Sequence, residues 1–404
     1  MKKVLLVLVL AFAVFTVAAC GQDESAQGVF DDRVIVGNTA ATSGPLAFVG
    51  VPFKAGMDAY FDMVNEEGGV NGRIIEYIQK DDEFNAALGL SYTQELVEDD
   101  QVFALVGHFG TPTVSATREY LNEVGIPRVY YATGVSSLFN LTATEGERSS
   151  FPVQPIFDAE GEVMIARAIK DLGAERVGVI YSNADDGRGM LRGIQLRAGE
   201  LGVALTSVVQ VAPDADDMST AAQIMLAADV DVVIVAANQV PAATAVRALN
   251  DAGSDIPVIT SYVNADATWL GGLGDVIGNF DIYGNAWIDI FNPDGSPTDD
   301  YALFAETIGE EFAANAFAFA GWIAAATFVE GLRRVGEEPL TWEAFIDAME
   351  ESPVELPFGV VVDFANGRRV GTQAMALLKA AMVEGAPVWE TERPIETITD
   401  ILSD

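Results

Sequence analysis

Short apolar runs alternate with amphipathic helical patterns along most of this 404-residue chain, and this alternation constrains its fold most strongly. Strands that alternate with helices of about ten or more residues are typical of a parallel sheet covered by helices on both faces. The pattern occurs twice, and the second series begins after Pro152 and Pro155. We therefore predict an α/β fold with two Rossmann-like lobes. The expected strands are residues 33–37, 74–78, 102–106 and 128–131, and then residues 177–181, 203–209, 232–236 and 257–261.

The chain changes character after Ile282. Residues 287–297 are expected to form a loop, and residues 358–363 and 372–382 are expected to pair as a hairpin around Asn366-Gly367. Helices could then return to the first lobe and the hairpin to the second, so that several crossings form a hinge. The helical patterns in this part of the chain cover residues 299–308, 315–335 and 342–350.

The N-terminus is typical of an exported protein. Lys2 and Lys3 precede an apolar run and small residues that lead to Cys20, so residues 1–19 are predicted to be a signal peptide. The tetrad Val-Ala-Ala-Cys at residues 17–20 resembles a bacterial lipobox, which implies a lipid anchor on Cys20 and a tether over residues 20–30. The alternative is an ordinary signal peptide in which this cysteine is incidental. Cys20 is the only cysteine, so no internal disulfide is expected.

Length and charge restrict the partners. About 385 mature residues are too many for one core and suit two domains. The formal net charge of −38 disfavours nucleic acid and anionic lipid as partners. A cationic ligand is one explanation for this charge. The acids are spread along the whole chain, however, which favours a solvated surface adapted to salty surroundings.

Residues 102–137 hold the strongest candidate for a binding site. The apolar run 102–106 is expected to turn at Gly107, and Thr111 and Pro112 suit the N-cap and first position of a helix. The next apolar run ends in the polar segment 132–137. Two adjacent parallel strands would thus end in donor-rich loops on one edge, where a small anion fits. Thr111 could instead serve only as a helix cap, although the two roles are compatible.

Several motifs together carry a family resemblance. The chain resembles the type I periplasmic solute-binding proteins of the leucine/isoleucine/valine-binding family, which serve ABC importers. The motifs are residues 42–45 (TSGP), 65–72 (NEEGGVNG), 80–82 (KDD), 106–113 (VGHFGTPT), 132–136 (ATGVS), 181–187 and 324–336.

This resemblance implies the type I periplasmic binding protein fold, with two lobes joined by a multi-strand hinge. It implies a monomeric, lipid-anchored protein in the periplasm or on the outer face of the cell membrane, with an ABC permease as partner. The implied divisions are a first lobe of residues 31–155 and 284–353, a second lobe of residues 156–283 and 354–393, and a tail of residues 394–404.

The resemblance also implies ligand-binding positions. The carboxylate-binding loop corresponds to Gly110 and Thr111, and the next ligand loop to Ala132, Thr133 and Ser136. Residues near the ligand's side chain and in the second lobe complete the set. These further positions are Ser43, Phe48, Val49, Asp186, Asn238, Tyr262 and Phe319.

One position departs from the family pattern. Amino-acid binders of this family usually hold the ligand ammonium with an acid after the strand that here ends at Ser261, where this chain has Tyr262. Asp186 or Asp266 could supply that acid. Otherwise the ligand lacks an amino group, as an aromatic or aliphatic acid does. The expected ligand is therefore a small carboxylate-bearing solute, either an amino acid or an organic acid.

Other functions have weaker support in the sequence. His108 is the only histidine and is expected to be a packed loop residue rather than a catalyst, so an enzyme is not expected. The alternatives are a ligand-sensing receptor module and, with less support, a hydrolase that uses carboxylates alone. The sequence contains no recognisable cofactor loop or Cys/His metal cluster, and we expect no cofactor and no metal.

Overall fold

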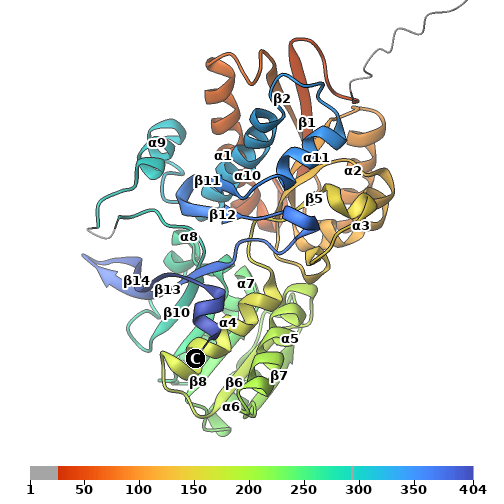
Figure 1. Cartoon of the computed structure of the whole chain (residues 1–404). Coiled ribbons are helices and arrows are strands. Elements are labelled where there is room, and N and C mark those ends of the chain that lie inside the picture. Colours follow the sequence, from red (N-terminus) through yellow and green to blue (C-terminus); the bar gives the residue numbers. More distant parts are fainter. Residues whose placement is uncertain (1–25, 293–294, 404) are drawn as a thin grey trace, which may run out of the picture.

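The computed structural model describes residues 26–292 and 295–403, and these residues form two lobes that lie one above the other in Figure 1. The predicted signal peptide and Cys20 lie outside the described residues. Within the described part of the chain, no helix has the length and apolar character that a membrane span requires.

The first lobe contains a five-stranded sheet in the order β2-β1-β3-β4-β5, and all its strand pairs are parallel. The central strand β3 is buried on both faces, as a sheet covered by two helical layers requires. Leu105 faces a cluster with helices α2 and α3, whereas Ala104 and Val106 face the cluster that includes α1 and α10. The strands are β1 (Arg33–Ala40), β2 (Ile74–Asp81), β3 (Ala104–Phe109), β4 (Arg128–Ala132) and β5 (Ser150–Phe151). The helices are α1 (Ala47–Glu66), α2 (Ala86–Glu98), α3 (Thr111–Val124), α9 (Asp299–Ile308), α10 (Ala316–Val335) and α11 (Trp342–Glu350).

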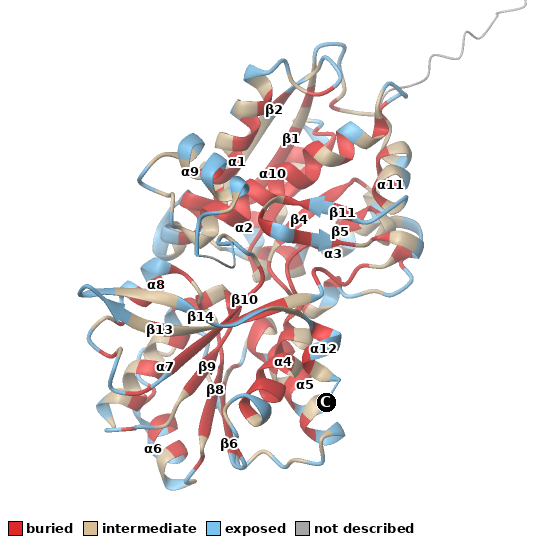
Figure 2. Cartoon of the chain, turned by 60° about the vertical axis from the view of Figure 1, so that its left-hand side comes forward, coloured by how far each residue is buried: buried red, intermediate tan, exposed pale blue. Residues whose placement is uncertain are grey.

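The second lobe contains a seven-stranded sheet in the order β14-β13-β10-β9-β8-β6-β7. The strands from β6 to β10 are parallel, and β13 and β14 add an antiparallel edge. Figure 2 shows the central strands β8 and β9 as buried. The strands are β6 (Val177–Ser182), β7 (Ser207–Val211), β8 (Val232–Ala236), β9 (Val258–Thr260), β10 (Ile282–Ala286), β13 (Ala374–Val383) and β14 (Ala386–Thr397). The helices are α4 (Phe157–Lys170), α5 (Asp185–Glu200), α6 (Ser219–Ala227), α7 (Gln239–Asp251), α8 (Ala267–Gly271) and α12 (Ile398–Leu402).

Among the described residues, three segments cross between the lobes: residues 152–156, the connection from β10 to α9, of which residues 287–292 and 295–298 are described, and residues 368–373. The first and third crossings are bonded to each other, because the Thr372 N–H donates to the Val153 carbonyl at 2.8 Å. A Cβ on Gly371 would come within 2.0 Å of the Gln154 carbonyl oxygen, so only glycine fits there. Short connecting segments at the ends of elements are where a hinge between two lobes is expected.

The C-terminal part differs from the sequence prediction in two respects. The hairpin expected between residues 358–363 and 372–382 is wrong: β12 (Val360–Val362) pairs with β11 (Val354–Leu356), and β13 pairs with β14. In addition, β11 and Phe358 pack against first-lobe helices, although residues 354–393 were expected in the second lobe. Val354, Leu356, Val360 and Val362 are buried in the same core cluster as α10, and this burial outweighs their proximity in sequence to β13.

Glycines let one pair of helices in each lobe approach very closely. A Cβ on Gly56 of α1 would lie 2.0 Å from the Ala318 carbonyl oxygen of α10, and one on Gly321 of α10 would lie 1.9 Å from the Phe53 carbonyl oxygen. The second lobe repeats this arrangement between α4 and α5, where Gly161 and Gly193 face carbonyl oxygens at 2.0 and 1.8 Å. Each sheet is therefore covered by a pair of helices in backbone contact.

We expect Gly56→Ala to destabilise the protein by about 1 to 3 kcal/mol, because the added methyl group forces α1 and α10 apart. Gly199→Ala in α5 is the matched control, since a Cβ there meets no atom within 4 Å. The control should be neutral or stabilising by up to about 1 kcal/mol. Urea denaturation of both variants measures the difference, and equal stabilities would contradict close contact at Gly56.

Candidate functional site

The predicted loops after β3 and β4 lie at the same edge of the first sheet. Phe109 and Ala132 are register partners at the ends of the two strands. Strand β3 does not turn at Gly107, as the sequence had suggested, but continues to Phe109 and turns at Gly110. Gly110 has φ 86°, a conformation that favours glycine, and the Phe84 ring covers it.

Thr111 is not the N-cap of α3, because Gly110 holds that position and Thr111 is the first helical residue. The cap role expected for Thr111 is therefore wrong. Its hydroxyl instead forms a 2.8 Å hydrogen bond with the Thr133 hydroxyl, across the gap between the two loops. The N–H groups of Thr111 and Thr113 find no acceptor within the described part of the chain. Two hydroxyls and the first-turn donors are thus gathered on one edge.

This edge faces the second lobe. The Phe157 N–H at the start of α4 donates to the Gly134 carbonyl at 2.7 Å, and the Ser115 hydroxyl of α3 donates to Asp185 of α5 at 3.1 Å. Ser136, which the sequence grouped with Thr133, instead donates to Asp158 and accepts from Arg192, both in the second lobe. Ser136 therefore takes part in a contact between the lobes.

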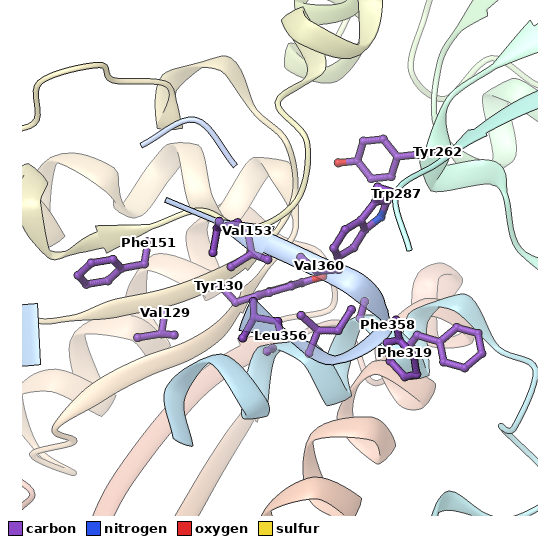
Figure 3. Packing of buried hydrophobic residues seen from close by; sticks show 14 of the residues in the cluster. Val129, Tyr130, Phe151, Val153, Tyr262, Trp287, Phe319, Leu356, Phe358 and Val360 are labelled. Atoms are coloured by element: carbon purple, nitrogen blue, oxygen red, sulfur yellow. The ribbon is translucent and has the colours of Figure 1, made fainter. Parts of the chain in front are cut away.

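Tyr262 lies between the lobes near the hinge. Its hydroxyl donates to the Pro155 carbonyl at 3.1 Å, and its ring stacks on Phe157 at a centroid distance of 6.0 Å. Figure 3 shows Tyr262 next to Trp287, with which it makes an edge contact. Burial raises the pKa of Tyr262 well above its ordinary value, so its hydroxyl stays protonated and remains a donor.

Glu160 of α4 is a buried acid that the sequence did not reveal. It accepts hydrogen bonds from the Ser261 hydroxyl at 2.9 Å, the Tyr262 N–H at 2.6 Å and the Asn285 side chain at 3.2 Å. It therefore fixes the loop after β9, where the family resemblance implied an acid. Burial raises the pKa of Glu160 to about 7, and its three hydrogen bonds oppose that rise. Glu160 lies 101 residues before Ser261, so no sequence pattern indicated this contact.

The two candidate acids for an ammonium differ in their surroundings. Asp186 lies in the first turn of α5, and burial raises its pKa. Asp266 caps α8 through the Thr268 and Trp269 N–H groups, and its second oxygen accepts from the Ala316 N–H at 3.2 Å. The last bond joins the second lobe to the start of α10.

The other predicted residues are spread around the two lobes. Asn238 precedes α7, and its buried Oδ1 has no hydrogen-bond partner among the described residues. Ser43 and Phe48 are exposed around the start of α1, whereas Val49 is buried. The Phe319 ring packs against the rings of Phe304 and Phe358, with centroid distances of 4.6 Å and 5.2 Å. These rings belong to an aromatic core beside the hinge (Figure 3).

His108 lies in β3 rather than in a loop. It is fully buried, and its Nε2 pairs with the Thr117 hydroxyl at 2.8 Å. Burial lowers its pKa to about 3, so the ring is neutral at ordinary pH. The described residues contain no cluster of three or more His, Cys, Asp or Glu side chains that could hold a metal ion.

Two hinged lobes with hydrogen-bond donors gathered on one facing edge define a two-lobed ligand-binding protein. The chain belongs to the periplasmic binding protein family, because the model of that family matches residues 33–385. This family consists of substrate-binding proteins rather than enzymes.

Individual relatives agree with this assignment. The chain is 30% identical over 189 residues to Leu/Ile/Val-binding protein homolog 6 of Brucella abortus, and the match covers 46% of this chain and 44% of the relative. The chain thus spans less than half the length of this curated relative.

Solved structures share the fold. A branched-chain amino acid ABC transporter protein from Thermus thermophilus with bound valine has a TM-score of 0.79 at 17% identity, and the match covers 93% of this chain and 100% of that chain. A fatty acid ABC transporter substrate-binding protein from Thermomonospora curvata has a TM-score of 0.76 at 18% identity, with coverages of 93% and 96%. The predicted type I periplasmic binding protein fold is confirmed.

Titration of Glu160 should be visible in the stability of the protein. Since the folded state raises this pKa from 4.5 to about 7, the folded protein binds the proton more tightly than the unfolded chain. The free energy of unfolding contributed by this group is therefore highest below about pH 4.5 and falls as pH rises towards 7, by roughly 3 kcal/mol. In Glu160→Gln, the free energy of unfolding should no longer show this fall with pH.

Urea denaturation between pH 4.5 and 8 measures the effect. Glu343→Gln, at an exposed site in α11, is the control for a simple change of charge and should keep the wild-type pH dependence. If wild type and Glu160→Gln show parallel curves, Glu160 does not titrate in this range.

Proposed function

We propose that this protein is the solute-binding component of an ABC importer and captures a small carboxylate-bearing solute between its two lobes. The observation that carries this proposal is the Thr111–Thr133 hydroxyl pair beside the unpaired first-turn N–H groups of α3. Hydroxyl and amide donors at a helix N-terminus suit a carboxylate.

In the proposed mechanism, the ligand carboxylate binds first to the open first lobe. The Thr111 hydroxyl and the N–H groups of Thr111 and Thr113 hold it, and the Thr133 hydroxyl donates to Thr111 and so orients the Thr111 proton towards the carboxylate. The second lobe then closes about the three crossings. Charge-assisted hydrogen bonds strengthen as water leaves, and the closed form offers a permease a shape that the empty protein lacks.

The location follows from the same proposal. A lipid on Cys20 would hold the protein at the periplasmic or outer face of the cell membrane, where it would act as a monomer and deliver its solute to a membrane permease. Support comes from the lipobox-like tetrad and from the family, whose named relatives include Leu/Ile/Val-binding proteins. A ligand-sensing receptor is the second candidate, because it can share this fold, but no described feature favours it.

We further propose that the ligand lacks an ammonium group. Two of the three acids near the second-lobe loops are engaged: Glu160 accepts three protein donors, and Asp266 accepts three as well. The third acid, Asp186, is buried, and burial raises its pKa, which disfavours the carboxylate form that an ammonium needs. An ammonium without an acid partner in a closed cleft carries a large desolvation cost. One structure with the same fold is described as a fatty acid ABC transporter substrate-binding protein, and a fatty acid has a carboxylate but no ammonium.

Thr111→Val should weaken binding of the carboxylate ligand by roughly 1 to 3 kcal/mol, because it removes one donor and leaves the Thr133 hydroxyl and the carboxylate with an unmet hydrogen bond. A thermal-shift screen over amino acids, aromatic acids, short carboxylates and amides identifies the ligand, and calorimetry measures its affinity. Thr307→Val on exposed α9 makes the same chemical change away from the edge and should leave affinity unchanged. Unchanged affinity in Thr111→Val would remove this residue from the site.

Leucine and isocaproate differ only in the amino group, and they test the proposed ligand class directly. Isocaproate should bind at least about tenfold more tightly, since the leucine ammonium would lose water without gaining an acid partner. Calorimetric titration of both compounds at neutral pH measures the ratio. Tighter binding of leucine would show that one of the second-lobe acids is released from its protein partners to hold the ammonium.

A further inference from the structure

A pocket lies in the first lobe, lined by α3, β4 and the segments after them. Neither Thr111 nor Thr133 lines it, and its cavity volume of about 20 Å³ suits one water molecule or one small ion. Figure 1 shows α3 and β5, which border it, next to each other. Three arginines contribute to the lining, in a chain whose formal net charge is −38: Arg118, Arg128 and Arg369.

Arg128 is the unusual member of this set. It is only 1% exposed, and its guanidinium donates to three neutral acceptors: Asn122 Oδ1 at 2.6 Å, the Gly146 carbonyl at 2.6 Å and the Ser149 hydroxyl at 2.8 Å. Its Nε is buried without a hydrogen-bond partner, and no carboxylate within the described residues forms an ion pair with it. A buried charge is normally paired, so Arg128 lacks the partner that its burial requires.

The neighbouring charges do not supply that partner. Arg118 pairs with Glu147 at 2.7 Å, Arg369 pairs with Glu350, and Arg148 pairs with both Glu350 and Asp347. Four arginines thus share three acids, which leaves one positive charge uncompensated. Burial lowers the pKa of the Arg128 guanidinium, and the charge of Arg118 lowers it further, yet an arginine remains protonated at ordinary pH.

We propose that this pocket binds one small monovalent anion, of the size and charge of chloride, against the Arg128 guanidinium. One negative charge neutralises the cluster, whereas a divalent anion would add repulsion from Glu147 and Glu350. The bound anion would tie α3 to the segment before β5 and to Arg369 at the start of a hinge crossing. Because it binds the folded protein only, it would stabilise the lobe in proportion to its concentration.

Bromide is the probe, since it replaces chloride and scatters anomalously. Crystals grown in sodium bromide should show an anomalous peak within hydrogen-bonding reach of the Arg128 guanidinium. In solution, thermal unfolding is followed at constant ionic strength while bromide replaces gluconate, which is too large for the pocket. The midpoint temperature of unfolding should rise with the bromide concentration and then level off. Absence of the peak, or a midpoint that does not respond, overturns the proposal.

Charge variants distinguish specific binding in this pocket from a general salt effect. Arg118→Gln should raise the half-saturating bromide concentration roughly tenfold, since a half-exposed positive charge beside the anion is lost. Glu147→Gln, which keeps one acceptor oxygen for Arg118 and removes the acceptor of Asn140, should lower it. Arg176→Gln in the second lobe, at a similar exposure, is the matched control and should leave it unchanged.

Each of these outcomes bears on the proposal. Equal responses in Arg118→Gln and Arg176→Gln would show that bromide acts by screening alone and would overturn it. Sulfate and nitrate serve as divalent and monovalent competitors of bromide at equal ionic strength. Sulfate should compete less effectively than nitrate. More effective competition by sulfate would contradict a monovalent site. Arg128→Gln should abolish the crystallographic peak, and the two milder variants keep the test decisive if Arg128→Gln does not fold.

Discussion

Parallel hydrogen bonding between neighbouring strands is the constraint on which the rest of this structure depends. Because β1, β3 and β4 run in the same direction, their connections must pass over the faces of the sheet, and their carboxyl ends meet at one edge. The same holds for β6, β8 and β9 in the second lobe. The proposed site is therefore built from loops that are remote in sequence, such as those that hold Thr111 and Thr133, and Asn238 and Tyr262 follow the carboxyl ends of β8 and β9 in the second sheet.

Away from the crossings the described hydrogen bonds between the lobes are polar contacts, whereas the crossings combine hydrogen bonds with an apolar core. Ser115 with Asp185, and Asp266 with the Ala316 N–H, are single hydrogen bonds that water could replace when the lobes separate. Around the crossings, by contrast, Tyr262, Trp287 and Phe358 belong to one continuous apolar core that reaches into both lobes (Figure 3). This difference permits rotation at the hinge without loss of the core, as domain closure requires.

Patterns of local origin were predictable from the sequence, and contacts between distant residues were not. The alternation of strands and helices predicted both sheets, and α11 has its expected bounds. The cap of α3 was misplaced by one residue, because Thr111 and Gly110 are both suitable caps and only the backbone at Gly110, with φ 86°, distinguishes them. The error at β11 and β12 arose because hairpin signals at Asn366-Gly367 are local, whereas burial against α10 decides the pairing. Glu160 could not be recognised, since a single acid in an amphipathic helix carries no mark of its distant partners.

The acidity of the chain bears on how a carboxylate could reach such a site. The large side chains buried most completely include Arg128, Arg167 and Arg369, so part of the small set of 22 basic residues is withdrawn from the surface. The outer field is therefore strongly negative and repels an anionic solute at long range. Salt screens that repulsion beyond about 10 Å at 0.1 M ionic strength, whereas short contacts to the first-turn donors of α3 and the Thr111 hydroxyl are screened much less. A surface of this kind is therefore compatible with anion capture in salty surroundings, where it keeps the protein soluble while the local donors hold the ligand.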